Sequence, residues 1–545
     1  MFDLKIINGK IVDGSGEPAY KGDIGIIGEK IVEIGDLSNK EAKTTIDANK
    51  KVVSPGFIDI HTHSDMSLVY DRYARSRIYT GVTTDVIGNC GIGVAPVKEE
   101  NRQLLLDYLG TRIVGSMPVK LELPWDTYAS YIKYMEENPP AVNVAPLLAQ
   151  GAIRIHEMGF SKEDPTDEQL QNMIDLTEEC FKCGALGLTS GLVYLPGEFT
   201  SQKELIELNK VTKKYGGFYA THMRNEGDDI EKAMDEAIDV CRQSGASLEI
   251  SHLKLSGKPN FGKTDMLFDK IEKARKEGLD VTFDVYPYNS GMTSLSALMP
   301  PWTFEGGVDK MIERIKLPEN REKIIHDIEN GLPGWQNFAS IVKSVPGIMI
   351  ASVVKDEDSW MEGKTLEEIS KELGIDDIYT TIFEILIKEN GRIQMVVEGM
   401  DEDDVIKILS KDDVSVGSDS MSLSHIGLLS KSSTHPRAFG TPSIVLGHYS
   451  REKGLFSIEK AVRKLTSNPA KRLGLKDRGL LKEGYYADIV IFDENTIIDK
   501  ATYKNPKQYP EGIETVLVNG NIAFKDGEQL DVLRGKVLKN EYASK

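Results

Sequence analysis

Residues that commonly bind metals or transfer protons follow five of the apolar segments in the middle of the chain. They are His61 and His63, Cys90, His222, His252 and Asp419. The chain has nine histidines, and four of them occupy these positions, so chance placement is a poor explanation. Two imidazoles and one thiolate, with a fourth position left open for water, are a typical catalytic zinc set. The pattern therefore predicts a zinc-dependent enzyme.

Each of these residues has a plainer explanation when it is considered alone. His61 and His63 are two apart in an extended segment, so their side chains point the same way, but an isolated His-x-His pair is weak evidence. A lone cysteine such as Cys90 is more often a small buried apolar residue. His222 and His252 could be satisfied core histidines. Their shared position after apolar segments favours the interpretation as ligands.

The chemistry that this set supports is hydrolysis. Zinc lowers the pKa of a bound water toward about 7 and polarises a carbonyl group. Asp419, in the segment VGSDS, would be the general base that takes the water proton and passes it to the leaving nitrogen. The alternative for Asp419 is a solvated loop carboxylate.

The segments that carry these residues alternate with stretches of helical periodicity, which is typical of a parallel sheet with crossover helices. We expect eight strands, at 52–60, 83–88, 142–148, 185–190, 217–221, 248–251, 281–286 and 414–417. The expected fold class is α/β, a (β/α)8 TIM-like barrel of the metal-dependent hydrolase type. Functional groups in such barrels lie at the carboxyl ends of the strands, where these residues are expected.

Two further strand-like segments, 347–354 and 393–400, are assigned to a long insertion after the seventh strand, at about 290–410. Loop-rich tracts within this insertion could form a lid. Short strands with Asn-Gly and Gly turns occupy both ends of the chain. The simplest interpretation is a small β-sandwich formed by residues 1–54 and 480–545, flanking a catalytic barrel at 55–479.

The composition restricts the classes of partner that the protein is expected to bind. The chain has 545 residues, 40% of them hydrophobic, and a net charge of −19, which argues against nucleic acid and anionic membranes as partners and leaves a small-molecule substrate. No apolar run is long enough to span a bilayer, and no signal peptide is recognisable. Four cysteines in this length do not form a disulfide scaffold, so the expected location is the cytoplasm. The oligomeric state stays open, a homo-oligomer included.

A family resemblance covers nearly the whole chain. It is carried by the segments PGFIDIHTHSD, GVTTDVIGNCG, YATHMR, ISHLK, DVYPY, VGSDS, THPRAFGT and GYYADIVIFD. Together they resemble the amidohydrolase superfamily and, within it, the D-aminoacylases, or N-acyl-D-amino-acid deacylases. Many relatives, such as hydantoinases, bridge two metals with a carboxylated lysine after the fourth strand. Here that strand ends in ALGLTSGLVY without a lysine, and Cys90 standing in for it is similar to the D-aminoacylase arrangement.

The resemblance implies zinc-dependent hydrolysis of the amide bond of N-acyl-D-amino acids to a carboxylate and a free D-amino acid. It also implies where zinc would bind. One tight site would be held by Cys90, His222 and His252. A second, weaker metal position would lie near His61, His63 and Asp419.

The resemblance further implies how the substrate carboxylate is held. Arg437 would bind it through its guanidinium fork, with Lys254 and Tyr194 assisting. Either Tyr286 or Tyr288 matches a remaining tyrosine of the family, and Tyr286 is favoured. The plainer alternatives are a surface ion pair for the arginine and packing at the barrel mouth for the tyrosines.

The sequence departs from the family at the third strand end, where Gln150 in AQGAIR stands in place of a histidine. This difference is expected to affect a detail of the pocket, in acyl or side-chain preference, and not the metal chemistry. Two other functions are weighed: a cyclic amide hydrolase of the hydantoinase or dihydropyrimidinase kind, and a catalytically dead barrel kept as a structural protein. The missing lysine argues against the first, and the retained ligands argue against the second.

Overall fold

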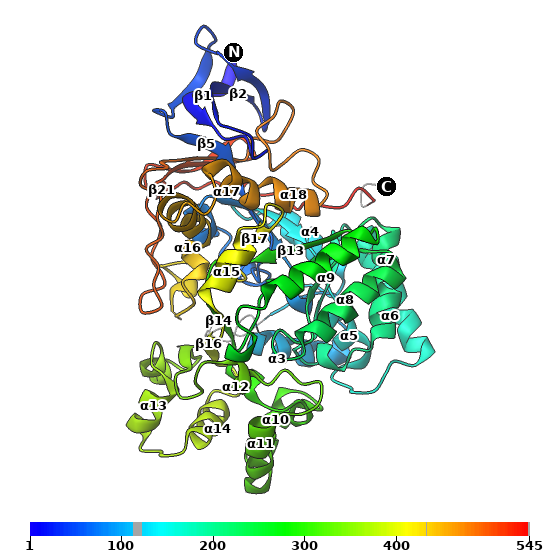
Figure 1. Cartoon of the computed structure of the whole chain (residues 1–545). Helices are drawn as coiled ribbons and strands as arrows, with labels where there is room; N and C mark the ends of the chain where they lie inside the picture. The colour runs from blue at the N-terminus through cyan, green and yellow to red at the C-terminus, as the bar shows by residue number, and fades with distance from the viewer. Residues whose placement is uncertain (113–121, 432, 543–545) are drawn as a thin grey trace.

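We describe the fold from a computed structural model, which covers residues 1–112, 122–431 and 433–542 (Figure 1). Short parallel strands occupy the middle of the molecule. In chain order they are β6 (Phe57–Asp59), β7 (Val82–Ile87), β8 (Asn143–Pro146), β9 (Leu148–Ala149), β10 (Gly187–Gly191), β11 (Phe218–His222), β12 (Ser247–Ile250), β13 (Val281–Val285) and β17 (Ser415–Val416). The α/β class expected from the sequence is confirmed.

These strands form two arcs, β6–β7–β8 and β9–β10–β11–β12–β13–β17. The arcs meet twice. On one side β8 leads into β9 after a single residue. On the other side Thr62, which follows β6, pairs in parallel with Ser420, which follows β17. The carboxyl ends of all these strands therefore face the same side of the molecule.

Amphipathic helices follow several of the strands and cover them from outside. They include α6 (Asp167–Lys182), α7 (Gln202–Lys214), α8 (Ile230–Ser244) and α9 (Thr264–Lys276). Helix α6 begins with a capping box, in which Thr166 and Gln169 satisfy each other's backbone N–H groups. Helix α8 buries residues three and four apart, such as Ala233 and Ala237, so one stripe of the helix packs inward. None of the helices in the described ranges has both the length and the apolar character needed to cross a bilayer.

Strands from both ends of the chain share one nine-stranded sheet. β5 (Val52–Pro55) is the link, because it pairs in parallel with β1 (Phe2–Ile11) and antiparallel with β18 (Ile489–Phe492). The strand expected at 52–60 is therefore divided at Gly56 between this sheet and β6. A side chain at Gly56 would collide with Thr83, since a Cβ there would lie 2.2 Å from Oγ1. The apolar pattern runs through the division, which hides it from the sequence.

The segment between β13 and β17 carries a separate antiparallel sheet in the order β14 (Ser290–Ser294), β16 (Gln394–Glu398) and β15 (Met349–Ser352). Helices α10 (Val308–Ile315), α11 (Pro318–Asn330), α13 (Leu366–Leu373) and α14 (Ile378–Lys388) surround this sheet at the end of the molecule opposite the N-terminus (Figure 1). Helix α15 (Glu402–Leu409) instead packs against α9 and β13, among the helices of the parallel strands.

Arg77 of α2 (Arg75–Ile78) ties together the strands where the two arcs meet. Its guanidinium lies 3.1 Å from Asp59 Oδ2 and 3.1 Å from Asp85 Oδ2, and it donates to the carbonyl of Ser420 over 2.7 Å. All of these side chains are buried. Burial raises the pKa of Asp85 to about 6 despite the attraction of Arg77. One arginine thus holds two carboxylates and the segment that carries Asp419.

Replacing this arginine gives the first prediction. Arg77→Met leaves two buried carboxylates without their cation, so we expect the free energy of unfolding to fall by about 3–5 kcal/mol. Arg75→Met is the matched control, because Arg75 forms a partly exposed i,i+4 pair with Asp71 worth less than about 1 kcal/mol. Urea unfolding followed by circular dichroism measures both. Equal losses of unfolding free energy in the two variants would contradict the role assigned to Arg77.

Candidate metal centre and substrate cavity

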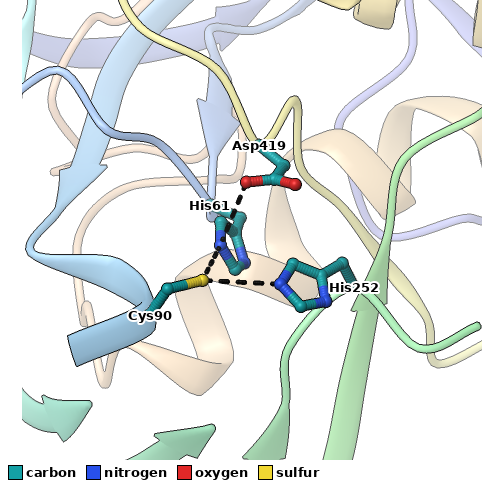
Figure 2. Close-up of side chains that lie close together, drawn as sticks. All are labelled: His61, Cys90, His252 and Asp419. Atoms are coloured by element: carbon teal, nitrogen blue, oxygen red, sulfur yellow. Dashed lines mark hydrogen bonds and ion pairs between the residues drawn. The ribbon is translucent and has the colours of Figure 1, made fainter. Parts of the chain in front are cut away.

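The six predicted ligands come together at the carboxyl ends of the parallel strands. His61 and His63 follow β6, Cys90 lies in the turn η1 (Asn89–Gly91) after β7, His222 ends β11, His252 follows β12, and Asp419 follows β17. Figure 2 shows four of these side chains pointing toward one another from separate segments. The arrangement brings together groups that are up to 358 residues apart, from His61 to Asp419.

Cys90 is at the centre of the first group. Its Sγ lies 3.1 Å from His61 Nε2 and 3.4 Å from His252 Nε2. Asp419 closes the group, with Oδ1 3.6 Å from His61 Nε2 and 3.0 Å from His63 Nε2. One donor atom from each of His61, Cys90, His252 and Asp419 lies within 4.8 Å of all the others, a spacing that a metal ion could bridge.

His222 joins this cluster through His252, since their ring centroids are 4.3 Å apart. Its Nε2 lies 3.2 Å from Glu226 Oε2. Its Nδ1 and Nε2 are both buried, and neither has a hydrogen-bond partner in the part of the chain that the structure describes. A buried ring nitrogen without a partner is costly, and a metal ion would satisfy it.

The backbone is strained at three of these residues. Cys90, His252 and Asp419 have φ values of 53°, 37° and 49°, in the left-handed region that residues with a Cβ rarely occupy. Such conformations cost about 1–3 kcal/mol each and cluster at functional sites. Each turns the chain sharply just after a strand, which aims the side chain into the cluster.

Electrostatics make this cluster receptive to a cation. Burial by itself raises the pKa of the Cys90 thiol, but the imidazoles of His61 and His252 hold it well below its ordinary value. Burial also acts against ionisation of Asp419, yet the Arg437 guanidinium and His63 hold the pKa of that carboxyl well below its usual range. Thiolate, imidazole and carboxylate are together the donor set that zinc prefers, so the residues fit a zinc ion.

Two cavities border the cluster and share Tyr194, Met292, Thr293 and Asp419 in their linings. The first also reaches Cys90 and Arg437, and the second reaches His222, His252 and Lys254. β14 and other parts of the insertion thus cover the open ends of the strands, above the predicted ligands.

The four predicted substrate-binding side chains all line these cavities. Arg437 Nη1 donates to Asp419 Oδ2 over 2.8 Å, and its guanidinium lies 4.8 Å from the Tyr286 ring centroid. Lys254 Nζ donates to Glu226 Oε1 over 2.6 Å. The Tyr194 ring meets the edge of the His222 ring, with centroids 5.0 Å apart.

Two neighbouring residues considered in the sequence analysis lie outside both cavities. Tyr288, the alternative to Tyr286, packs against the His435 ring and lines neither cavity. Gln150, at the start of α5 (Gln150–Met158), is buried and donates to Glu204 Oε1 over 2.7 Å and to Thr200 Oγ1 over 2.9 Å. It lines neither cavity, so it makes no direct contact through which it could change the acyl or side-chain preference.

Two buried carboxylates at the site were not singled out from the sequence. Glu226 lies four residues after His222, and Asp284 lies at the end of β13 within DVYPY. Asp284 approaches His61 Nδ1 at 3.3 Å and accepts the backbone N–H of His252 over 2.9 Å. A carboxylate beside a histidine at a strand end is the signal that could have identified both.

Comparison with known proteins agrees with this geometry. A family model described as "Amidohydrolase family" matches residues 44–113 and 353–524. D-aminoacylase from Alcaligenes xylosoxydans xylosoxydans is 34% identical over 537 residues, which is 98% of this chain and 97% of that protein. This chain belongs to the D-aminoacylase family of amidohydrolases. N-acyl-D-glutamate deacylase from the same organism is 33% identical, over 96% of this chain and 93% of that protein.

Solved structures of this family superpose on nearly the whole chain. A D-aminoacylase with a binuclear metal centre gives a TM-score of 0.80 at 32% identity, covering 99% of this chain and 100% of that one. N-acyl-D-glutamate deacylase from Bordetella bronchiseptica, solved with zinc and a phosphonate mimic of the tetrahedral intermediate, gives 0.81 at 30% identity and 99% of both chains. L-hydantoinase from Arthrobacter aurescens covers 99% of this chain and 100% of that one, but at 17% identity and a TM-score of 0.52 it shares only the fold.

Thiol reactivity gives the second prediction. In protein stripped of metal, iodoacetamide at pH 7 should alkylate Cys90 first, because its lowered pKa keeps it a thiolate and it lines a cavity. Burial raises the pKa of Cys180, Cys183 and Cys241, the last to about 12, so these thiols should react slowly.

Peptide mapping by mass spectrometry measures the extent of modification at each cysteine over time. Protein reloaded with zinc should be protected at Cys90 alone, because zinc would bind the same sulfur. Equal alkylation of Cys90 with and without zinc would contradict its assignment as a ligand.

Proposed function

We propose that this protein hydrolyses the amide bond of N-acyl-D-amino acids at a zinc centre, releasing a carboxylate and a free D-amino acid. The observation that carries the proposal is the contact of Cys90 with both His61 and His252. A cysteine in this place, with no lysine after β10, separates the D-aminoacylase arrangement from that of the cyclic amide hydrolases. The near full-length relatives, all named as deacylases of D-amino acids or as D-aminoacylase, support it.

The metal would be held at two positions of unequal strength. Cys90, His222 and His252 would hold the tight zinc, and His61, His63 and Asp419 would border a second, weaker position. Bound zinc polarises a carbonyl and lowers the pKa of water. The related D-aminoacylase has a binuclear centre, which supports two positions here.

Asp419 would move the proton. Its ionised carboxylate can accept a proton from the attacking water and deliver it to the leaving nitrogen, as a general base and then a general acid. Arg437 and His63 keep it ionised and fix its orientation, each through a different oxygen. The left-handed backbone of Asp419 aims it at the point where both cavities meet.

The substrate carboxylate would be held on the far side of the scissile amide. The guanidinium fork of Arg437 suits bidentate binding of a carboxylate, and Lys254 adds a second cation. Tyr194 lines both cavities, and Tyr286 lines the second one with Lys254. A free carboxylate beside the amide distinguishes an N-acyl amino acid from a simple amide, so these residues would supply recognition.

The second cavity favours an uncharged amino-acid side chain. Its wall from the insertion is formed by Phe338, Ile341, Val342, Val397 and Met400. Lys254 is the lysine in that lining, and Glu226 pairs with it. Because Lys254 would already face Glu226 and the substrate's own carboxylate, an acidic side chain would lose its hydration there without gaining a cation of its own. We infer a preference for apolar D-amino acids over D-glutamate and D-aspartate.

We also infer that the two arcs of parallel strands close into a (β/α)8 barrel at residues 55–479, with the insertion at about 290–410. The sheet shared by residues 1–54 and 480–545 would form the small β-sandwich. The pairing of Thr62 with Ser420 and the pairing of β5 with β18 support this division.

Hydrolysis of a panel of substrates gives the third prediction. We expect release of free amino acid from N-acetyl-D-methionine and N-acetyl-D-leucine, much less from N-acetyl-D-glutamate, and none from the L series. Removal of the metal by a chelator should abolish this release of amino acid, and added zinc should restore it. Turnover of hydantoin in place of these linear amides would favour the cyclic amide hydrolase, and equal turnover of both enantiomers would overturn the assignment.

Replacement of the proposed proton carrier gives the fourth prediction. Asp419→Asn should lower kcat by about 10²–10⁴-fold, the usual contribution of a general acid–base, because an amide cannot take the proton. Steady-state kinetics with N-acetyl-D-methionine measures it. The tight zinc, counted by elemental analysis, should remain. An Asn variant with wild-type kcat would remove Asp419 from the mechanism.

A further inference from the structure

Glu226 occupies a buried position behind the metal centre, in the loop that follows β11. Only 4% of the residue is exposed. Three nitrogen atoms surround its carboxylate. Oε2 lies 3.2 Å from His222 Nε2, and Oε1 lies 3.0 Å from His252 Nδ1 and 2.6 Å from Lys254 Nζ.

The two histidines use different ring nitrogens toward this carboxylate. His252 Nδ1 lies 3.0 Å from Glu226 Oε1 and 2.7 Å from Lys254 Nζ, and its Nε2 faces the Cys90 sulfur at 3.4 Å. His222 brings Nε2 to 3.2 Å from Glu226 Oε2, and both of its ring nitrogens are buried without a hydrogen-bond partner among the described residues. A neutral imidazole carries one N–H, so the nitrogen that donates to the carboxylate leaves the other nitrogen with a free lone pair.

We propose that Glu226 is a positioning residue that sets the tautomers of His222 and His252 together, one through each carboxylate oxygen, and anchors Lys254. This role deepens the proposed function. It rests on that function only for the identity of the bound ion, which is taken to be zinc. With Nδ1–H of His252 directed to Glu226, its Nε2 keeps a lone pair toward the Cys90 sulfur, whereas Nδ1 accepting from Lys254 would place the proton on Nε2. With Nε2–H of His222 directed to Glu226, its buried Nδ1 keeps a lone pair for a metal. A metal-binding histidine commonly donates its other N–H to a carboxylate, and here one carboxylate serves two ligands.

Glu226 is itself close enough to His222 and His252 to be considered a ligand. Its contacts argue for the positioning role, because each oxygen lies within 3.2 Å of a ring nitrogen and Oε1 also accepts from Lys254. An oxygen that accepts these protons does not have the same lone pairs free for a metal. The shared oxygen also couples the metal centre to the substrate side, since Lys254 lines the second cavity beside Tyr286.

The variant Glu226→Gln tests this role. Glutamine keeps the size of the side chain but offers one acceptor oxygen and an NH₂ group, so one of the two histidines loses its acceptor and its tautomer is no longer fixed. We expect zinc affinity to fall by about 10–100-fold. Competition of the full-length protein with a chromophoric zinc chelator measures the dissociation constant. Steady-state kinetics should also show a raised KM, because Lys254 loses its anchor.

Glu204→Gln is the matched control. Glu204 is equally buried and is paired with Arg154 and Gln150, but it lines neither cavity. This variant should lose stability in urea while binding zinc as tightly as the unmodified protein. Zinc affinity in Glu226→Gln equal to that of Glu204→Gln would overturn the proposal.

The zinc competition needs no substrate. If no N-acyl amino acid were hydrolysed, the proposed function would fail while this measurement still decided the role of Glu226.

Discussion

The structure depends on holding a thiolate, several imidazoles and a carboxylate together where water is scarce. Each of these groups would cost several kcal/mol to bury alone, and the cost falls only when opposite charges lie within hydrogen-bond reach. The carboxyl ends of parallel strands make this possible, because they bring short turns from distant parts of the chain to one place. Cys90 stabilises the imidazoles around it, and they lower its pKa in return. The positive φ values at Cys90, His252 and Asp419 are the strain that this convergence requires.

Behind the proposed ligands, a second set of charges fixes their orientation. Arg77 donates a hydrogen bond to the Ser420 carbonyl, next to Asp419. Asp284 contacts His61, and Glu226 contacts His252. None of these three has to touch a substrate to matter. A ligand that rotates by a few tens of degrees loses its lone-pair direction, so the precision of the centre is set by these contacts. The insertion contributes the opposite kind of surface, an apolar one, over the same opening.

The sequence was enough to single out the proposed ligands, because residue type and position at a strand end are both local properties. His61, Cys90, His222 and His252 are rare residue types, and each follows a recognisable apolar segment. Glu226, Asp284 and Arg77 could not be found in the same way. The chain has 85 acidic residues and 66 basic ones, most of which face water, so a position near a strand end marks Glu226 and Asp284 only weakly, and nothing in the sequence marks Arg77. Gly56 shows the same limit in the fold, since its conflict with Thr83 comes from a neighbouring strand.

The replacement of a bridging lysine by Cys90 has a consequence for charge. A carboxylated lysine brings one negative charge to the point between two metal positions, and a cysteine thiolate brings the same charge on a softer atom that zinc prefers. The thiolate comes from the turn after β7 and Glu226 from the loop after β11, so the position proposed between Cys90, His222 and His252 would receive negative charge from two groups. The position near His61, His63 and Asp419 has Arg437 beside its carboxylate, which weakens its attraction for a cation. This asymmetry is the physical basis of the proposal that one metal position is tight and the other weaker.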